Sequence, residues 1–125
     1  MRFITLATAL AVFAAADTAR AGDAGPVAEI VTFRLIDGGN PIAFSAAANG
    51  MAPFLNSTGA ILSRTLSVDE TGLWTDHITW TSLQAARSAA SQMMEQPAAA
   101  PFIALIDPDS VEMRHAPIRY TMKPE

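Results

Sequence analysis

Alternating apolar and polar residues predict four β-strands along the chain. Residues 27–36 are rich in β-branched and aromatic side chains, which favour extended structure. Residues 60–68 and 73–80 show a hydrophobic period of two on either side of a turn at 69–72, as the strands of a β-hairpin do. Residues 111–122 form the last predicted strand.

The two central strands each carry a charged residue among apolar positions. The first has Leu62, Leu66 and Val68 in alternation with polar residues, but Arg64 interrupts their apolar side. In the second, Asp76 falls on the face formed by Trp74, Ile78 and Trp80. The opposite face of that strand carries Leu73, Thr75, His77 and Thr79.

Helical periodicity follows the first strand. From Ile42 onwards, one apolar stripe has helical spacing and consists of Phe44, Ala47, Ala48, Met51 and Leu55. Asn40 is the predicted N-cap and Pro41 the first helical residue. Gly50 and Pro53 predict that this helix kinks or ends early.

A second helix follows the third strand. Thr81 is its predicted N-cap, with Gln84 completing a capping box, and the helix runs to about Glu95, before Pro97. Its inner stripe is Ala86, Ala89, Ala90, Met93 and Met94. A short helical turn at 101–106 and a turn at 107–110 lead to the last strand. The order β-α-β-β-α-β predicts an α+β ferredoxin-like sandwich, in which the helices cover one face of a four-stranded antiparallel sheet.

The N-terminal segment has the pattern of a Sec-type signal peptide. Arg2 precedes an apolar run at 4–16, and Ala19-Arg20-Ala21 is a small-x-small sequence that signal peptidase accepts. The run is shorter than the roughly 20 residues that span a bilayer. We expect a signal peptide at 1–21 cleaved after Ala21, a single domain at 22–125, and a periplasmic or secreted product without a membrane anchor after cleavage. A retained N-terminal anchor is the alternative.

Charge and cysteine content exclude several function classes. Twelve acidic and eight basic residues give a net charge of −4, and no basic cluster is present to bind nucleic acid. The absence of cysteine excludes disulfides, thiolate metal sites and cysteine nucleophiles. The spacing of Asp76, His77, Glu112 and His115 matches no metal-binding motif, so we expect no metal. The motifs of serine hydrolases and nucleotide-binding loops do not occur.

His77 is the strongest candidate for acid–base chemistry, because an imidazole titrates near neutral pH. As a general base it would take a proton from a weakly acidic hydroxyl such as that of a phenol. The alternative is a structural histidine, hydrogen-bonded to Thr75, Thr79 or a hydroxyl on a neighbouring strand.

A ligand pocket is the second candidate site. Trp74 and Trp80 can stack on an aromatic molecule. The apolar residues that can shape a pocket around it are Met51, Phe54, Met93 and Phe102. His115 and Arg119 share one face of the last predicted strand, where Arg119 can contact a carboxylate or an oxyanion. The alternatives are that the apolar residues only form the core and that Arg119 is a solvated strand end.

With its elements in this order, the chain resembles the dimeric α/β-barrel superfamily that includes the antibiotic-biosynthesis monooxygenases. The resemblance covers residues 27–122. It is carried by the first strand with Phe44 in the following helix, by Gly59-Ala60-Ile61-Leu62-Ser63-Arg64, and above all by Gly72-Leu73-Trp74-Thr75-Asp76-His77-Ile78-Thr79-Trp80-Thr81-Ser82. The tail at 101–107, with Met113-Arg114-His115 beyond it, resembles that of a branch of small exported proteins with no assigned role.

This resemblance implies a homodimer whose two sheets meet face to face, with a cavity between sheet and helices for a small, often aromatic molecule. Members include cofactor-free oxygenases of electron-rich phenols and haem-degrading enzymes. The haem degraders use an Asn in the first strand and a histidine in a helix, and this sequence has neither, so we expect no cofactor. The leading hypothesis is an exported dimer that binds a small apolar or aromatic molecule. The alternatives are a cofactor-independent monooxygenase of a phenolic substrate and a non-catalytic protein-interaction module.

Overall fold

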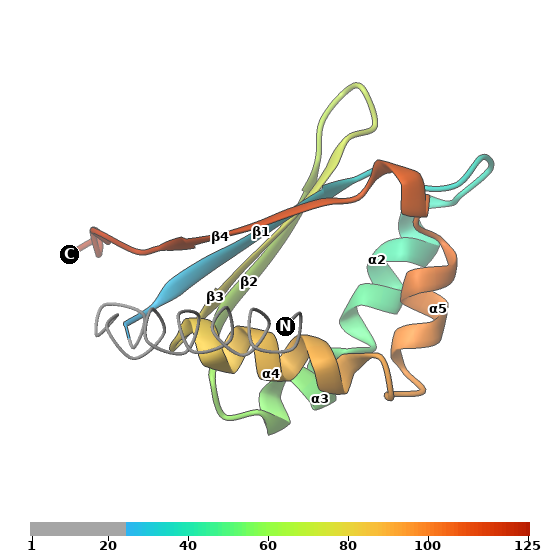
Figure 1. The fold of residues 1–125 in the computed structure, drawn as a ribbon. Helices are drawn as coiled ribbons and strands as arrows, with labels where there is room; N and C mark the ends of the chain where they lie inside the picture. The colour runs from blue at the N-terminus through green and yellow to red at the C-terminus, as the bar shows by residue number, and fades with distance from the viewer. Residues whose placement is uncertain (1–24) are drawn as a thin grey trace, which may run out of the picture.

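The strands form one antiparallel sheet in the order β2-β3-β1-β4 (Figure 1). The computed structural model describes residues 25–125, so the predicted signal peptide at 1–21 and its cleavage site lie outside the described residues. The strands are β1 (Val27–Phe33), β2 (Ile61–Val68), β3 (Trp74–Trp80) and β4 (Glu112–Pro117). The helices are α2 (Pro41–Asn49), α3 (Ala52–Ser57), α4 (Leu83–Met93) and α5 (Ala99–Ala104), and a 3₁₀ turn, η2, spans Pro108–Ser110. The predicted ferredoxin-like α+β fold is confirmed.

The four helices lie on the same side of the sheet, and α2 and α5 run side by side (Figure 1). Phe44 of α2 is fully buried between them and the sheet. Its ring contacts those of Phe33, Trp74 and Phe102 at centroid distances of 5.4, 4.9 and 4.9 Å. Burying a side chain of this size contributes roughly 1.5–3 kcal/mol to the free energy of unfolding, so this aromatic cluster anchors the helices to the sheet.

Burial alternates residue by residue along β3 and identifies the two faces of the sheet. Trp74, Asp76, Ile78 and Trp80 are buried on the helix side, as their spacing predicts. His77 is partly exposed on the other face, which no helix of residues 25–125 covers (Figure 1). We call this uncovered side the outer face.

A β-bulge in β2 changes which residues of that strand face the helices. Ile61 pairs with Trp80 and Ser63 with Thr79, so Leu62 is the extra residue, and it is 57% exposed. The prediction that Leu62 belongs to the apolar side of the strand is therefore wrong. Beyond the bulge Arg64 lies opposite Ile78, on the helix side of the sheet.

The start of the first helical segment follows the predicted signals. The Asn40 side chain accepts hydrogen bonds from the backbone N–H groups of Ile42 and Ala43 at 2.8 and 3.1 Å, and Pro41 is the first helical residue. The segment breaks between α2 and α3, where Gly50 and Pro53 predict a kink or an early end.

The N-cap of α4 is Ser82 and not the predicted Thr81. The Ser82 hydroxyl accepts a hydrogen bond from the Ala85 N–H at 3.1 Å. Thr81 instead donates its backbone N–H to the Ala60 carbonyl at 2.9 Å, which extends the β2–β3 pairing by one residue. The helix therefore begins one residue later than the capping-box pattern indicates.

Two strands are shorter than predicted. β1 ends at Phe33, and Leu35 makes only an isolated bridge to Ile106. β4 ends at Pro117: the Ile118 N–H still donates to the Pro26 carbonyl at 2.9 Å, but Pro26 has no N–H to donate in return, so the predicted strand to residue 122 is wrong in its last five residues. Within residues 25–125, no helix has both the length and the apolar character needed to cross a membrane.

Candidate functional site

A cavity of about 360 Å³ lies between the helix side of the sheet and helices α3, α4 and α5. Strands β1, β3 and β4 supply one wall, and α4 and α5 supply the opposite wall. Five of the residues predicted to bind a ligand line this cavity: Met51, Phe54, Trp80, Met93 and Phe102. The structure therefore brings together most of the residues that the sequence predicts to bind a ligand.

The other predicted site residues lie elsewhere. Trp74 is buried in the core against Phe44 and is not part of the cavity wall. Arg119 is exposed in the segment after β4, so the expectation that it shares a strand face with His115 is wrong, because the strand ends at Pro117.

His77 lies on the outer face, between Ile30 of β1 and Thr65 of β2 in the strand register. Since successive side chains of a strand point to opposite faces, the sheet separates His77 from Trp74 and Trp80. One chain therefore does not bring these three residues into one site.

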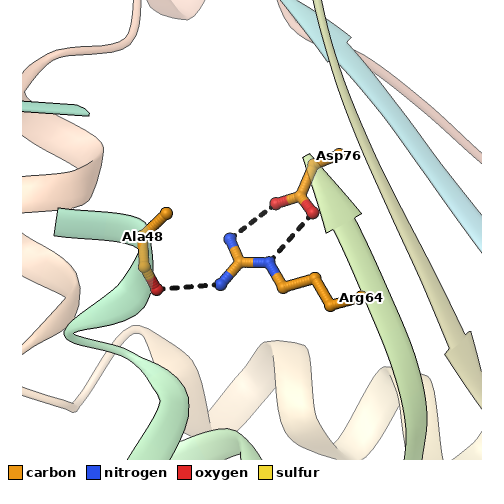
Figure 2. Close-up of polar contacts among 3 residues, drawn as sticks. All are labelled: Ala48, Arg64 and Asp76. Carbon is orange, nitrogen blue, oxygen red and sulfur yellow. Dashed lines mark hydrogen bonds and ion pairs between the residues drawn. The ribbon is translucent and has the colours of Figure 1, made fainter. Parts of the chain in front are cut away.

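An ion pair that was not predicted as a site stands in the wall of the cavity (Figure 2). The Arg64 Nε and Nη2 atoms donate to the two carboxylate oxygens of Asp76 at 3.0 and 2.7 Å, and Arg64 Nη1 donates to the Ala48 carbonyl of α2 at 3.0 Å. The guanidinium carbon also lies 5.3 Å from the centre of the Phe102 ring. Arg64 therefore joins β2, β3, α2 and α5, and its charge is balanced inside the protein.

A sequence signal for this pair exists. Arg64 interrupts the apolar side of one strand of the hairpin, and Asp76 lies on the apolar face of the other. Opposite charges at such positions of paired strands indicate a buried ion pair, because a charged group is buried at acceptable cost only with a partner. The bulge at Leu62 determines the register that makes the contact, and the sequence pattern does not show it.

Glu29 is a second buried charged residue that sequence reasoning missed. It is 8% exposed on the helix side of β1 and lines the cavity. Its Oε1 atom lies 2.9 Å from Nε2 of His115, its partner in the register of β1 and β4. His115, a predicted ligand-binding residue, therefore contacts a residue of the cavity wall but is not itself part of the wall.

Trp80 supplies an unpaired polar group. The residue is 2% exposed, and its indole Nε1 has no hydrogen-bond partner in the part of the chain that the structure describes. A buried N–H without an acceptor carries a free-energy cost of about 1–3 kcal/mol. A ligand or water oxygen beside Trp80 would remove that cost.

Few charged residues line the cavity. Its ionisable lining residues are Glu29, Arg64 and Asp76. The Arg64–Asp76 pair is neutral as a unit, which leaves the Glu29–His115 pair to determine the net charge of the site. Among residues 25–125, no group of three or more His, Asp or Glu side chains is placed to hold a metal ion.

Comparison with known proteins identifies the fold. No model of a protein family matches the chain, and no characterised protein matches it by sequence. The fold is nevertheless shared with several solved structures. The cofactor-independent oxygenase SnoaB from Streptomyces nogalater aligns with 81% of this chain and 100% of its own, at 22% identity and a TM-score of 0.65.

Two further structures support the same assignment. A putative antibiotic biosynthesis monooxygenase from Caulobacter crescentus aligns with 78% of this chain and 93% of its own, at 12% identity and a TM-score of 0.64. The monooxygenase from the gene ActVA-Orf6 of Streptomyces coelicolor, solved with the ligand nanaomycin D, aligns with 82% of this chain and 95% of its own, at 19% identity and a TM-score of 0.57. The chain therefore has the ferredoxin-like fold that these structures share.

Proposed function

We propose that this protein binds a small hydroxyaromatic molecule in the cavity between sheet and helices and oxygenates it with O₂ without a metal or flavin. The observation that carries the proposal is the cavity, which is lined by aromatic and methionine side chains and has few polar groups. Aromatic walls favour a flat ring by dispersion and edge contacts, and methionine adapts to its outline. An apolar cavity with a few placed polar groups is the usual form of a small-molecule site.

The structural neighbours favour an oxygenase over simple storage of a ligand. SnoaB is described as a cofactor-independent oxygenase and aligns over its whole length, and the Streptomyces coelicolor monooxygenase was solved with nanaomycin D. Fold likeness does not transfer an activity by itself. The likeness in fold indicates which reaction to test, and the aromatic and methionine lining of the cavity indicates the class of substrate.

The reaction balances without an external reductant. A phenol and one O₂ give a quinone and one water, with the ring supplying all four electrons. Glu29, the carboxylate of the cavity wall outside the Arg64–Asp76 pair, takes the proton of the bound phenol and becomes neutral, and the phenolate that remains passes an electron to O₂ more readily. The walls of the cavity keep bulk water away from this anion. The Trp80 N–H is buried without a partner among residues 25–125, and we propose that the indole ring turns to donate it to an oxygen of the substrate.

The direct test is conversion of 1-naphthol to 1,4-naphthoquinone, followed by O₂ uptake and by absorbance. Trp80→Phe retains an aromatic ring and removes the N–H, so we expect kcat/KM to fall by about tenfold, the cost of losing about 1.4 kcal/mol of transition-state stabilisation. Trp74→Phe is the matched control, because Trp74 is equally buried but does not line the cavity. We expect its kcat/KM to stay within about twofold of the wild type.

Each outcome decides a different part of the proposal. Binding of naphthol without O₂ uptake would retain the ligand site and reject the oxygenase. No binding and no uptake would reject both and leave the non-catalytic interaction module. Equal losses in the two tryptophan variants would show that Trp80 acts only through packing.

A further inference from the structure

The buried Glu29–His115 pair suggests how the cavity selects its ligand. We propose that Glu29, held in place by His115, is the specificity-determining residue: it accepts a hydrogen bond from a neutral hydroxyaromatic ligand and excludes aromatic carboxylates. This inference rests on the proposed function, because it requires an aromatic ligand in the cavity.

Glu29 is placed for this role by its strand position. It faces the helices from the centre of β1 and lines the cavity, although only 8% of its surface is exposed. One oxygen of the Glu29 carboxylate, Oε1, lies 2.9 Å from His115 Nε2. The other oxygen has no side-chain partner among residues 25–125. A carboxylate has about four acceptor positions, so the pair leaves Glu29 able to accept a further hydrogen bond from a ligand hydroxyl.

The remaining charges of the cavity do not attract an anion. Arg64 is the lining cation, and its charge is balanced by Asp76, to which two of its five N–H groups donate, with a third directed to the Ala48 carbonyl. The cavity residues of α4 and α5 carry no titratable groups; they are Ala89, Ala90, Met93, Met94, Phe102 and Ile103. A ligand carboxylate would therefore meet the charge of Glu29 in a largely apolar space without a free counter-charge.

His115 is a positioning residue in this scheme. Its Nε2 atom lies 2.9 Å from Oε1 of Glu29 and fixes the orientation of that carboxylate. The other charged residues of the cavity wall are Asp76 on β3 and Arg64 on β2, which form an ion pair with each other.

The test compares three ligands of one shape by equilibrium dialysis against the full mature chain: 1-naphthol, naphthalene and 1-naphthoate. We expect the wild type at pH 8 to bind 1-naphthol at least tenfold more tightly than 1-naphthoate, with naphthalene between them. Glu29→Gln retains size and removes charge, so it should bind 1-naphthoate about tenfold better and reduce the discrimination accordingly. His115→Ala removes the contact that fixes Glu29 and should reduce the discrimination, whereas His115→Gln keeps a hydrogen-bond donor and should retain it.

Arg114→Gln is the matched control, since Arg114 precedes His115 on β4 and is exposed. It should leave the order of the three affinities unchanged. Equal affinity of the wild type for 1-naphthol and 1-naphthoate, or an unchanged ratio in a folded Glu29→Gln protein, would overturn the inference alone. Should Glu29→Gln not fold, the wild-type ratio still decides. If the protein binds neither naphthalene nor 1-naphthol, the proposed function is overturned and this inference with it.

Discussion

Arg64 and Asp76 are charged residues at apolar positions of their strands, and together they form an ion pair that links two strands and a helix. Their side chains are 16% and 6% exposed and share two hydrogen bonds, an arrangement that gives a planar, directional contact (Figure 2). Each charge alone would be costly in this position, and each is acceptable because the other is present. The pair therefore specifies how β2, β3 and α2 fit together beside the cavity.

Breaking this pair from one side is expected to destabilise the protein strongly. Asp76→Asn removes the negative charge and leaves the buried Arg64 charge with neutral oxygen acceptors alone, and we expect the free energy of unfolding to fall by about 3 kcal/mol. The double replacement Arg64→Met with Asp76→Leu removes both charges and should cost less than the single change. Urea denaturation of the three proteins measures this. A double variant that loses as much stability as Asp76→Asn, or more, would contradict the account.

At the same scale, the apolar residues of the cavity wall can be predicted from the sequence, whereas the contacts of its polar residues cannot. Met51, Phe54 and Phe102 could be predicted because apolar side chains at helical spacing face the core. The contact of Glu29 with His115 could not be predicted, because it depends on the register of β1 and β4. Arg64 and Asp76 stand out in the sequence as charges on apolar faces, but the bulge that brings them into contact does not. His77 stands out in the sequence as a titratable group, but the face on which it lies separates it from the cavity.

At the scale of elements, the β2–β3 turn is organised by one carboxylate. Asp69 Oδ1 accepts hydrogen bonds from the Thr71 hydroxyl at 2.6 Å, the Thr71 N–H at 2.8 Å and the Leu73 N–H at 3.0 Å. The Thr71 hydroxyl, the Leu73 and Thr71 amides and the nearby Arg34 charge all favour the ionised form and hold the pKa of Asp69 below its ordinary value. Gly72 closes the turn with a φ of 86°, which a side chain would strain.

The lowered pKa of Asp69 makes the stability of the hairpin depend on pH. A carboxyl with a lower pKa in the folded state stabilises the protein above its unfolded pKa of about 4 and loses this contribution as the pH falls through the folded value. We expect Asp69→Asn to lower the melting temperature at pH 7 and to have less effect near pH 3. Thermal melts at the two pH values test this. An equal effect at both would show that the charge of Asp69 is not involved.

The limits of the elements were less predictable than their order. The Asn40 cap and the break before α3 follow from local sequence, since a cap and a proline act on their own neighbours. The start of α4 and the end of β1 depend on sheet contacts made by Thr81 and Leu35 with residues distant in the sequence. Local patterns do not contain those contacts.

At the scale of the whole molecule, the outer face is the surface that remains to be explained. It includes Ile30, Thr65 and His77 and is uncovered in a single chain of residues 25–125 (Figure 1). We propose that a second copy covers it, with the two sheets face to face. Export after cleavage at Ala21 likewise stays a prediction from the N-terminal sequence.

The proposed dimer has a specific test at this face. Thr65 is exposed beside His77, so Thr65→Arg would place a charge between the two sheets. We expect sedimentation equilibrium to show a dimer for the wild type and at least a tenfold weaker association for this variant. Glu70→Arg, in the exposed hairpin turn, is the control and should remain dimeric. A monomeric wild type would contradict the proposal.

The central claim is that the cavity between sheet and helices, and not the outer face, receives the aromatic ligand. The most direct measurement is a crystal structure with 6-bromo-2-naphthol, in which anomalous scattering locates the bromine. The account predicts a peak inside the cavity, with the naphthol ring against Phe102 and its hydroxyl within hydrogen-bond distance of Glu29. A bromine peak on the outer face beside His77, with the cavity empty at saturating ligand, would contradict it.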